Sequence, residues 1–141
     1  MIPVDDFRQM ISYDKLTSDG TITLARIAAE AIRGLNWTTN CDAGLDQPSA
    51  AYDVLGALSQ AAARLGQLLT QITRYLDQAL AAGKLGHDRG EDPALAVEGA
   101  VIFLDDARLS AAALAGDLDA AQQQLALING HPAPCTPRDQ T

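Results

Sequence analysis

The sequence has few aromatic residues: they make up 4% of its 141 positions and comprise one Trp, three Tyr and two Phe. A core must therefore be built mainly from Leu and Ala, and such a core depends on the close approach of helices. The chain contains neither about 18 uninterrupted apolar residues nor a basic N-terminal region followed by an apolar run. We therefore expect no membrane span and no signal peptide. With only two cysteines, the expected location is cytoplasmic, where thiols stay reduced.

Positive charge is also scarce in this sequence. Ten Lys and Arg residues stand against 18 Asp and Glu residues, which gives a net charge of −8. Because such a surface repels other anions, we expect neither nucleic acid nor an anionic membrane as a partner. A basic protein is a better electrostatic match. The chain is 48% hydrophobic and 20% charged, a composition typical of a folded globular domain.

Two long segments with helical periodicity dominate the chain, residues 49–82 and 94–129. Apolar residues recur in each at alternating steps of three and four, which places them along one side of a helix. Pro48 opens the first segment, and Asp92 supplies a capping carboxylate before the second. Residues 83–92 form the loop between them, and we expect an antiparallel hairpin. Its two apolar seams are Ala51, Leu55, Leu58, Ala62, Leu65, Leu69, Ile72, Leu76 and Ala79, and Val97, Ala100, Leu104, Ala107, Ala111, Leu114, Leu118, Ala121, Leu125 and Ile128.

Antiparallel pairing of the seams sets large residues against small ones. Leu65 then faces Ala111, and Leu114 faces Ala62, so that side chains of unequal size fill the space between the helices. Because these seams contain only Ala, Val, Leu and Ile, we expect a dry interior that does not suit a buried ligand or metal.

The remaining segments are shorter. The sequence predicts a short amphipathic helix over residues 3–13, a helix over residues 21–35 and an irregular connection over residues 36–48. We therefore predict an all-α fold, an antiparallel helical bundle built on a long two-helix hairpin with one medium helix and a short N-terminal helix. It forms a single domain over residues 1–130, followed by a flexible tail at 131–141.

The candidate interaction surface is the back of the second hairpin segment near the loop. Its apolar residues lie outside the seam, and something must cover them. The cover comes either from the helix at 3–13, through Phe7 and Met10, or from a second subunit or another protein. The residues of this surface are Val101, Ile102, Phe103 and Leu109.

Candidate catalytic and metal-binding groups are sparse. His87 lies in the hairpin loop among carboxylates, a pattern typical of a solvated turn. Cys41 and Cys135 are brought to one end of the hairpin, where three states are open: a disulfide, a metal site completed by His131, or two reduced thiols. The adjacent carboxylates at Asp105 and Asp106 point about 100° apart on a helix, so they cannot face each other as an acid and base pair.

No phosphate loop, nucleophile motif or metal-binding motif is present in the sequence. We therefore expect no catalytic residues, no cofactor and no bound metal. The predicted function is that of a non-catalytic helical protein-interaction module, which forms a homodimer or binds a protein partner. The alternative is a small acidic regulator, antitoxin-like or DNA-mimicking, that sequesters a basic protein.

Overall fold

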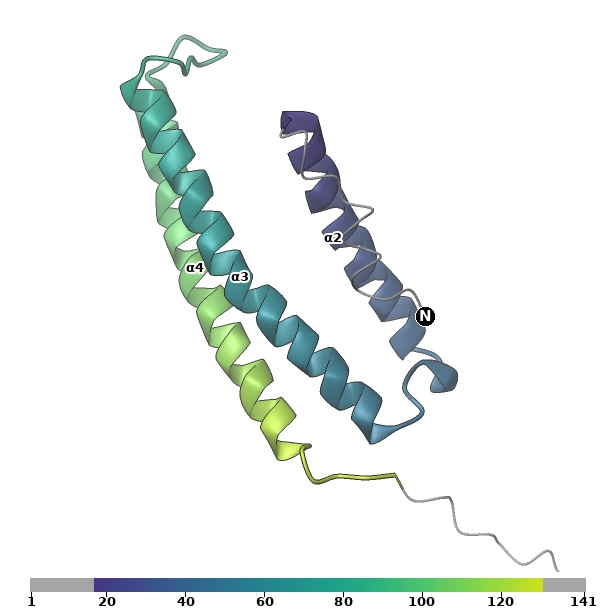
Figure 1. Ribbon diagram of the computed structural model, residues 1–141. Coiled ribbons are helices and arrows are strands. Elements are labelled where there is room, and N and C mark those ends of the chain that lie inside the picture. Colours follow the sequence, from purple (N-terminus) through teal and green to yellow (C-terminus); the bar gives the residue numbers. More distant parts are fainter. Residues whose placement is uncertain (1–16, 131–141) are drawn as a thin grey trace, which may run out of the picture. The chain divides into compact units, whose positions relative to one another are not determined.

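The computed structural model describes residues 17–130, which form four helical elements. They are α2 (Ser18–Thr39), the short 3-10 helix η1 (Asp42–Gly44), α3 (Pro48–Ala81) and α4 (Pro93–Gln124). No strand occurs in this range, and α3 and α4 pack against each other along their length (Figure 1). The predicted all-α fold built on a helix hairpin is therefore confirmed. The predicted helix at 3–13 and the tail at 131–141 lie outside the described residues.

The chain divides into two compact units, with the boundary between Asp46 and Gln47. The first unit contains α2 and η1. Its helix begins three residues before the predicted start, because the hydroxyl of Thr17 caps it by accepting a hydrogen bond from the amide of Gly20 at 3.0 Å. The sequence interpretation placed the cap within residues 14–20 and the helix itself only from residue 21.

The far end of α2 also extends beyond the prediction, to Thr39 instead of residue 35. The hydroxyls of Thr38 and Thr39 both donate to the carbonyl of Leu35, at 3.2 and 2.7 Å, and so support the last turn. Trp37 therefore belongs to a helix and not to an irregular connection. Beyond it, η1 folds back so closely that a Cβ atom at Gly44 would collide with the carbonyl of Thr38.

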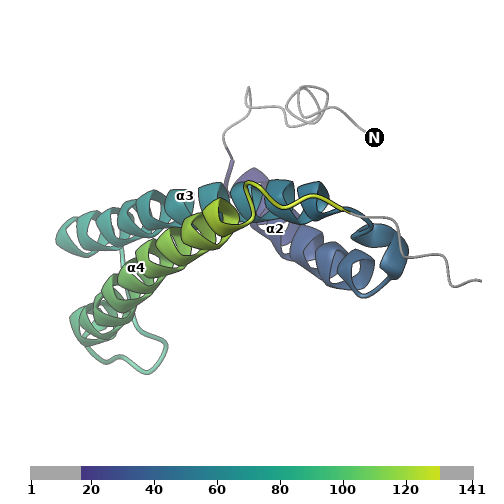
Figure 2. The same ribbon diagram turned by 90° about the horizontal axis from the view of Figure 1, so that it is seen from below.

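The second unit is the hairpin. α3 starts with Pro48 at its first position, and Gly83 follows its end with a φ of 68°. α4 starts where predicted, because the carboxylate of Asp92 accepts a hydrogen bond from the amide of Ala94 at 3.0 Å. Figures 1 and 2 show the two helices side by side, crossing each other at an angle.

The end of α4 differs from the prediction. The helix stops at Gln124 and not at residue 129, so Leu125 and Ile128 are not in its regular part. The amides of these two residues bond to carbonyls three positions back, at 3.0 Å in each case. Such tighter turns commonly supply hydrogen bonds to the last carbonyls of a helix, because these carbonyls have no helical amide four residues further along the chain.

The interface between α3 and α4 buries fewer residues than the predicted layers of large residues against small ones would bury. Its only buried residues within 17–130 are Ala62, Ala79, Val97 and Ala111. Leu114, which was expected to fill space against Ala62, is 49% exposed. The small buried residues let the two backbones approach closely, and this close approach moves the larger side chains to the edges of the interface.

Polar side chains make hydrogen bonds beside the interface, while the residues buried in it within 17–130 are all apolar. The hydroxyl of Ser59 donates to the carbonyl of Ala115 at 2.9 Å, and the amide of Gln122 donates to the carbonyl of Tyr52 at 3.2 Å. Both hydrogen bonds are partly buried and connect the two helices. Gly56 makes room for the second, because a Cβ atom there would meet the amide nitrogen of Gln122.

Candidate interaction surface

The two sides of the hairpin differ in character. One side is a hollow between α3 and α4, lined by small or polar residues: Ala63, Gly66, Thr70, Arg108, Ala112 and Ala115. Since successive residues turn about 100° round a helix, Ala63, Gly66 and Thr70 lie on one side of the buried Ala62. The residues on the other side of Ala62 form a different surface.

This second side carries large apolar residues from both helices. In α3, Leu65, Leu68 and Ile72 lie on the side of Ala62 away from the hollow, as does Tyr75. In α4, Phe103 and Leu114 lie on the matching side of Ala111. We call these six residues the apolar face. Between 40% and 74% of each is exposed, although side chains of this size are usually buried in a folded protein.

The candidate surface predicted from the sequence does not form one patch. Ile102 and Leu109 lie seven residues apart on the outer side of α4 and, with Leu95, form an exposed row that we call the outer row. Phe103 is turned about 100° away from Ile102 and belongs to the apolar face. The predicted patch therefore spans two surfaces of one helix.

The other predicted interaction residues are placed as follows. Val101 is half-buried and borders a hollow with Asp77 and Leu80 of α3, so it lies at the hairpin interface. Phe7 and Met10 lie outside the described residues, as does their predicted role in covering α4.

The sequence interpretation missed the contribution of α3. It placed Leu65 and Ile72 in the seam and treated the rest of that helix as polar. Leu68 and Tyr75 stand seven residues apart, beside the seam positions, and this spacing was the available signal.

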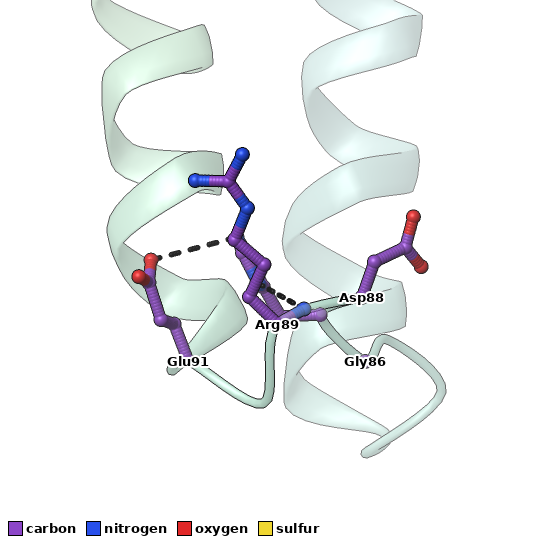
Figure 3. A pocket seen from close by; sticks show the side chains of 5 residues that line it. Gly86, Asp88, Arg89 and Glu91 are labelled. Atoms are coloured by element: carbon purple, nitrogen blue, oxygen red, sulfur yellow. Dashed lines mark hydrogen bonds and ion pairs between the residues drawn. The ribbon is translucent and has the colours of Figure 1, made fainter.

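The hairpin loop brings the charged side chains of Asp88, Arg89 and Glu91 together around a shallow hollow (Figure 3). His87 lies 3.6 Å from the carboxylate of Glu91, and its Nδ1 atom accepts a hydrogen bond from the amide of Arg89 at 3.1 Å. Gly90, with a φ of 72°, allows the tight turn. Within residues 17–130, no group of three or more His, Cys, Asp or Glu residues is arranged to hold a metal ion. The loop is therefore a mostly exposed turn in which His87 contacts both Arg89 and Glu91.

Cys41 lies just after α2 and is exposed. Its thiol donates to the carbonyl of Trp37 at 3.6 Å. Cys135 and His131 lie outside the described residues. The disulfide, the metal site and the pair of reduced thiols therefore remain the three predicted alternatives.

Comparison with known proteins adds no assignment, since no protein-family model, curated protein or solved structure matches this chain. No helix in the described part of the chain is long and apolar enough to cross a membrane.

Proposed function

We propose that this protein is a non-catalytic helical protein-interaction module that self-associates through the apolar surface of its hairpin. The observation that carries the proposal is the contrast within the hairpin. Its interface buries four residues, all of them small or medium in size, while six large apolar side chains lie exposed on one face. Contiguous exposed apolar surface of this kind marks interaction sites in proteins.

Energetics support the same proposal. Burying a large apolar side chain contributes about 1.5–3 kcal/mol relative to full exposure. Covering six half-exposed side chains with a partner would therefore stabilise the complex by several kcal/mol. A hairpin that buries only Ala62, Ala79, Val97 and Ala111 gains little from its own core. Because a pair of helices has few other ways to offset its conformational entropy, a partner that covers the face would stabilise the fold.

The alternative is a small acidic regulator that sequesters a basic protein in the cytoplasm. The charge distribution of α4 favours it, because this helix carries Glu98, Asp105, Asp106, Asp117 and Asp119 against a single basic residue, Arg108. Such binding depends on charge and weakens steeply as salt rises, whereas apolar association changes little with salt.

Sedimentation velocity over a range of protein concentrations, at low and at high salt, separates the two candidates. For the interaction module we expect a species heavier than the 14.8 kDa chain, persisting at high salt. A single monomeric species at every concentration would contradict self-association. If the chain stays monomeric and instead binds small basic proteins in a salt-sensitive manner, the acidic regulator becomes the better assignment.

A further inference from the structure

We infer that the partner of the apolar face is a second copy of this chain, and that two hairpins dock face to face to close an antiparallel four-helix bundle. This inference rests on the proposed self-association and adds which surface is used and how the copies are oriented. α3 of one copy lies over α4 of the other, related by a two-fold axis parallel to the helices.

The first argument is the shape of the face. It spans both helices at one level of the hairpin: Thr73 of α3 lines a hollow with Leu104 of α4, next to Ile72 and Phe103 respectively. A surface two helices wide is covered best by two further helices, as in four-helix bundles. The outer row, in contrast, runs along α4 alone.

The second argument is the fit between large and small residues. Between Phe103 and Leu114, the face of α4 presents Ala107 and Ser110, with Asp106 beside them at its outer edge. A two-fold axis parallel to the helices keeps each residue at its own level. Leu68 of one copy then lies over Ala107 and Ser110 of the other, between Phe103 and Leu114. Large residues set into small gaps are the arrangement by which helices pack at native density.

The third argument is the charge at the edges of the face. Arg64 lies along its α3 edge, whereas Asp106 and Asp117 lie along its α4 edge. The two-fold rotation places the α3 edge of one copy beside the α4 edge of the other, so that Arg64 lies on the same edge as the partner copy's aspartates. The part of the face nearer the interface between α3 and α4 carries no charged side chain. One arginine at each edge lessens the repulsion expected between two chains that each carry a net charge of −8.

Substitutions on the two surfaces test the inference. Leu68→Glu and Phe103→Glu place a charge on the apolar face, and Ile102→Glu and Leu109→Glu place the same charge on the outer row. All four residues are exposed on the hairpin. The dissociation constant of the dimer, measured by sedimentation equilibrium, should rise about tenfold or more for the two face variants, because a buried unpaired charge opposes association. The outer-row variants should dimerise like the unmodified chain.

A second substitution, added to Leu68→Glu, tests the orientation of the two copies. Restored dimerisation would also show that Leu68→Glu lost the dimer through its charge and not through unfolding. Adding Ser110→Lys to Leu68→Glu sets opposite charges against each other when α3 lies over α4, so dimerisation should be restored. Leu109→Lys added to Leu68→Glu should not restore it. In a dimer with α3 over α3, glutamate would meet glutamate, and neither lysine would help.

Three results would overturn the inference. They are dimers that persist in both face variants, dimers lost only in the outer-row variants, and the absence of rescue by Ser110→Lys. In each case the unmodified chain still dimerises, so the proposed function stands. A chain that is monomeric before any substitution would instead contradict the proposed self-association itself.

Discussion

At the scale of single residues, two polar side chains determine how the hairpin helices align. Ser59 and Gln122 donate hydrogen bonds to carbonyl groups of the opposite helix, at 2.9 and 3.2 Å. A slide of one helix along the other would break both bonds and leave partly buried donors without partners, which is costly. An interface lined only by alanine and leucine would tolerate such a slide more easily. The polar groups therefore specify one register.

We expect Gln122→Ala to lower the free energy of unfolding by about 0.5–1.5 kcal/mol more than Gln124→Ala does. Both residues lie in the last turn of α4, and Gln124 is exposed. The difference between the two variants therefore reports the bond from Gln122 to the carbonyl of Tyr52. Urea unfolding followed by circular dichroism measures it, and equal midpoints would show that this bond contributes nothing.

At the scale of elements, α4 carries large apolar residues on several sides. Val97 and Ala111 face α3, Phe103 and Leu114 belong to the apolar face, and Leu95, Ile102 and Leu109 form the outer row. A helix of this kind is normally covered on several sides. Its periodicity alone does not identify the side that packs against α3, because several sides carry apolar residues. Strong terminal signals at Asp92 and Pro93 nevertheless determine where it begins.

Asp92→Ala should destabilise the hairpin by about 0.5–2 kcal/mol, because it removes the capping bond to the amide of Ala94. Asp88→Ala, in the same loop and with the same change of charge, is the matched control. Thermal unfolding followed by circular dichroism makes the comparison. If both variants melted together and below the unmodified chain, the loss would come from net charge and not from the cap.

At the scale of the whole molecule, the described chain consists of two units that are each short of buried surface. The first unit contains α2 and η1, and the second contains a hairpin whose buried residues number four. Neither has the extensive core of an ordinary domain. A protein of this kind gains stability from association, and its stability then depends on its concentration.

We therefore expect the melting temperature of the unmodified protein to rise as its concentration is raised. The Phe103→Glu variant should melt at a temperature that does not change with concentration, because it does not dimerise. Calorimetry over a wide concentration range checks both expectations. A melting temperature independent of concentration in the unmodified chain would contradict a link between folding and association.

The sequence alone was sufficient to predict the helical fold, the hairpin and most helix starts. These features depend on local chemistry, since Pro48, Asp92 and Pro93 act on the backbone next to them. The same reasoning failed at Trp37 and at Leu125. Whether a helix continues there depends on hydrogen bonds made by Thr38 and Thr39, or on a tightening of the last turn.

Only the tertiary structure decided which residues are buried and which are left exposed. Close approach at Ala62 and Ala111 moved Leu65 and Leu114 out to the edge of the interface. This approach also admitted Ser59 and Gln122, and it joined Phe103 to a face built mainly from α3. Periodicity defines the sides of each helix, but the distance and rotation between two helices depend on the side chains of both.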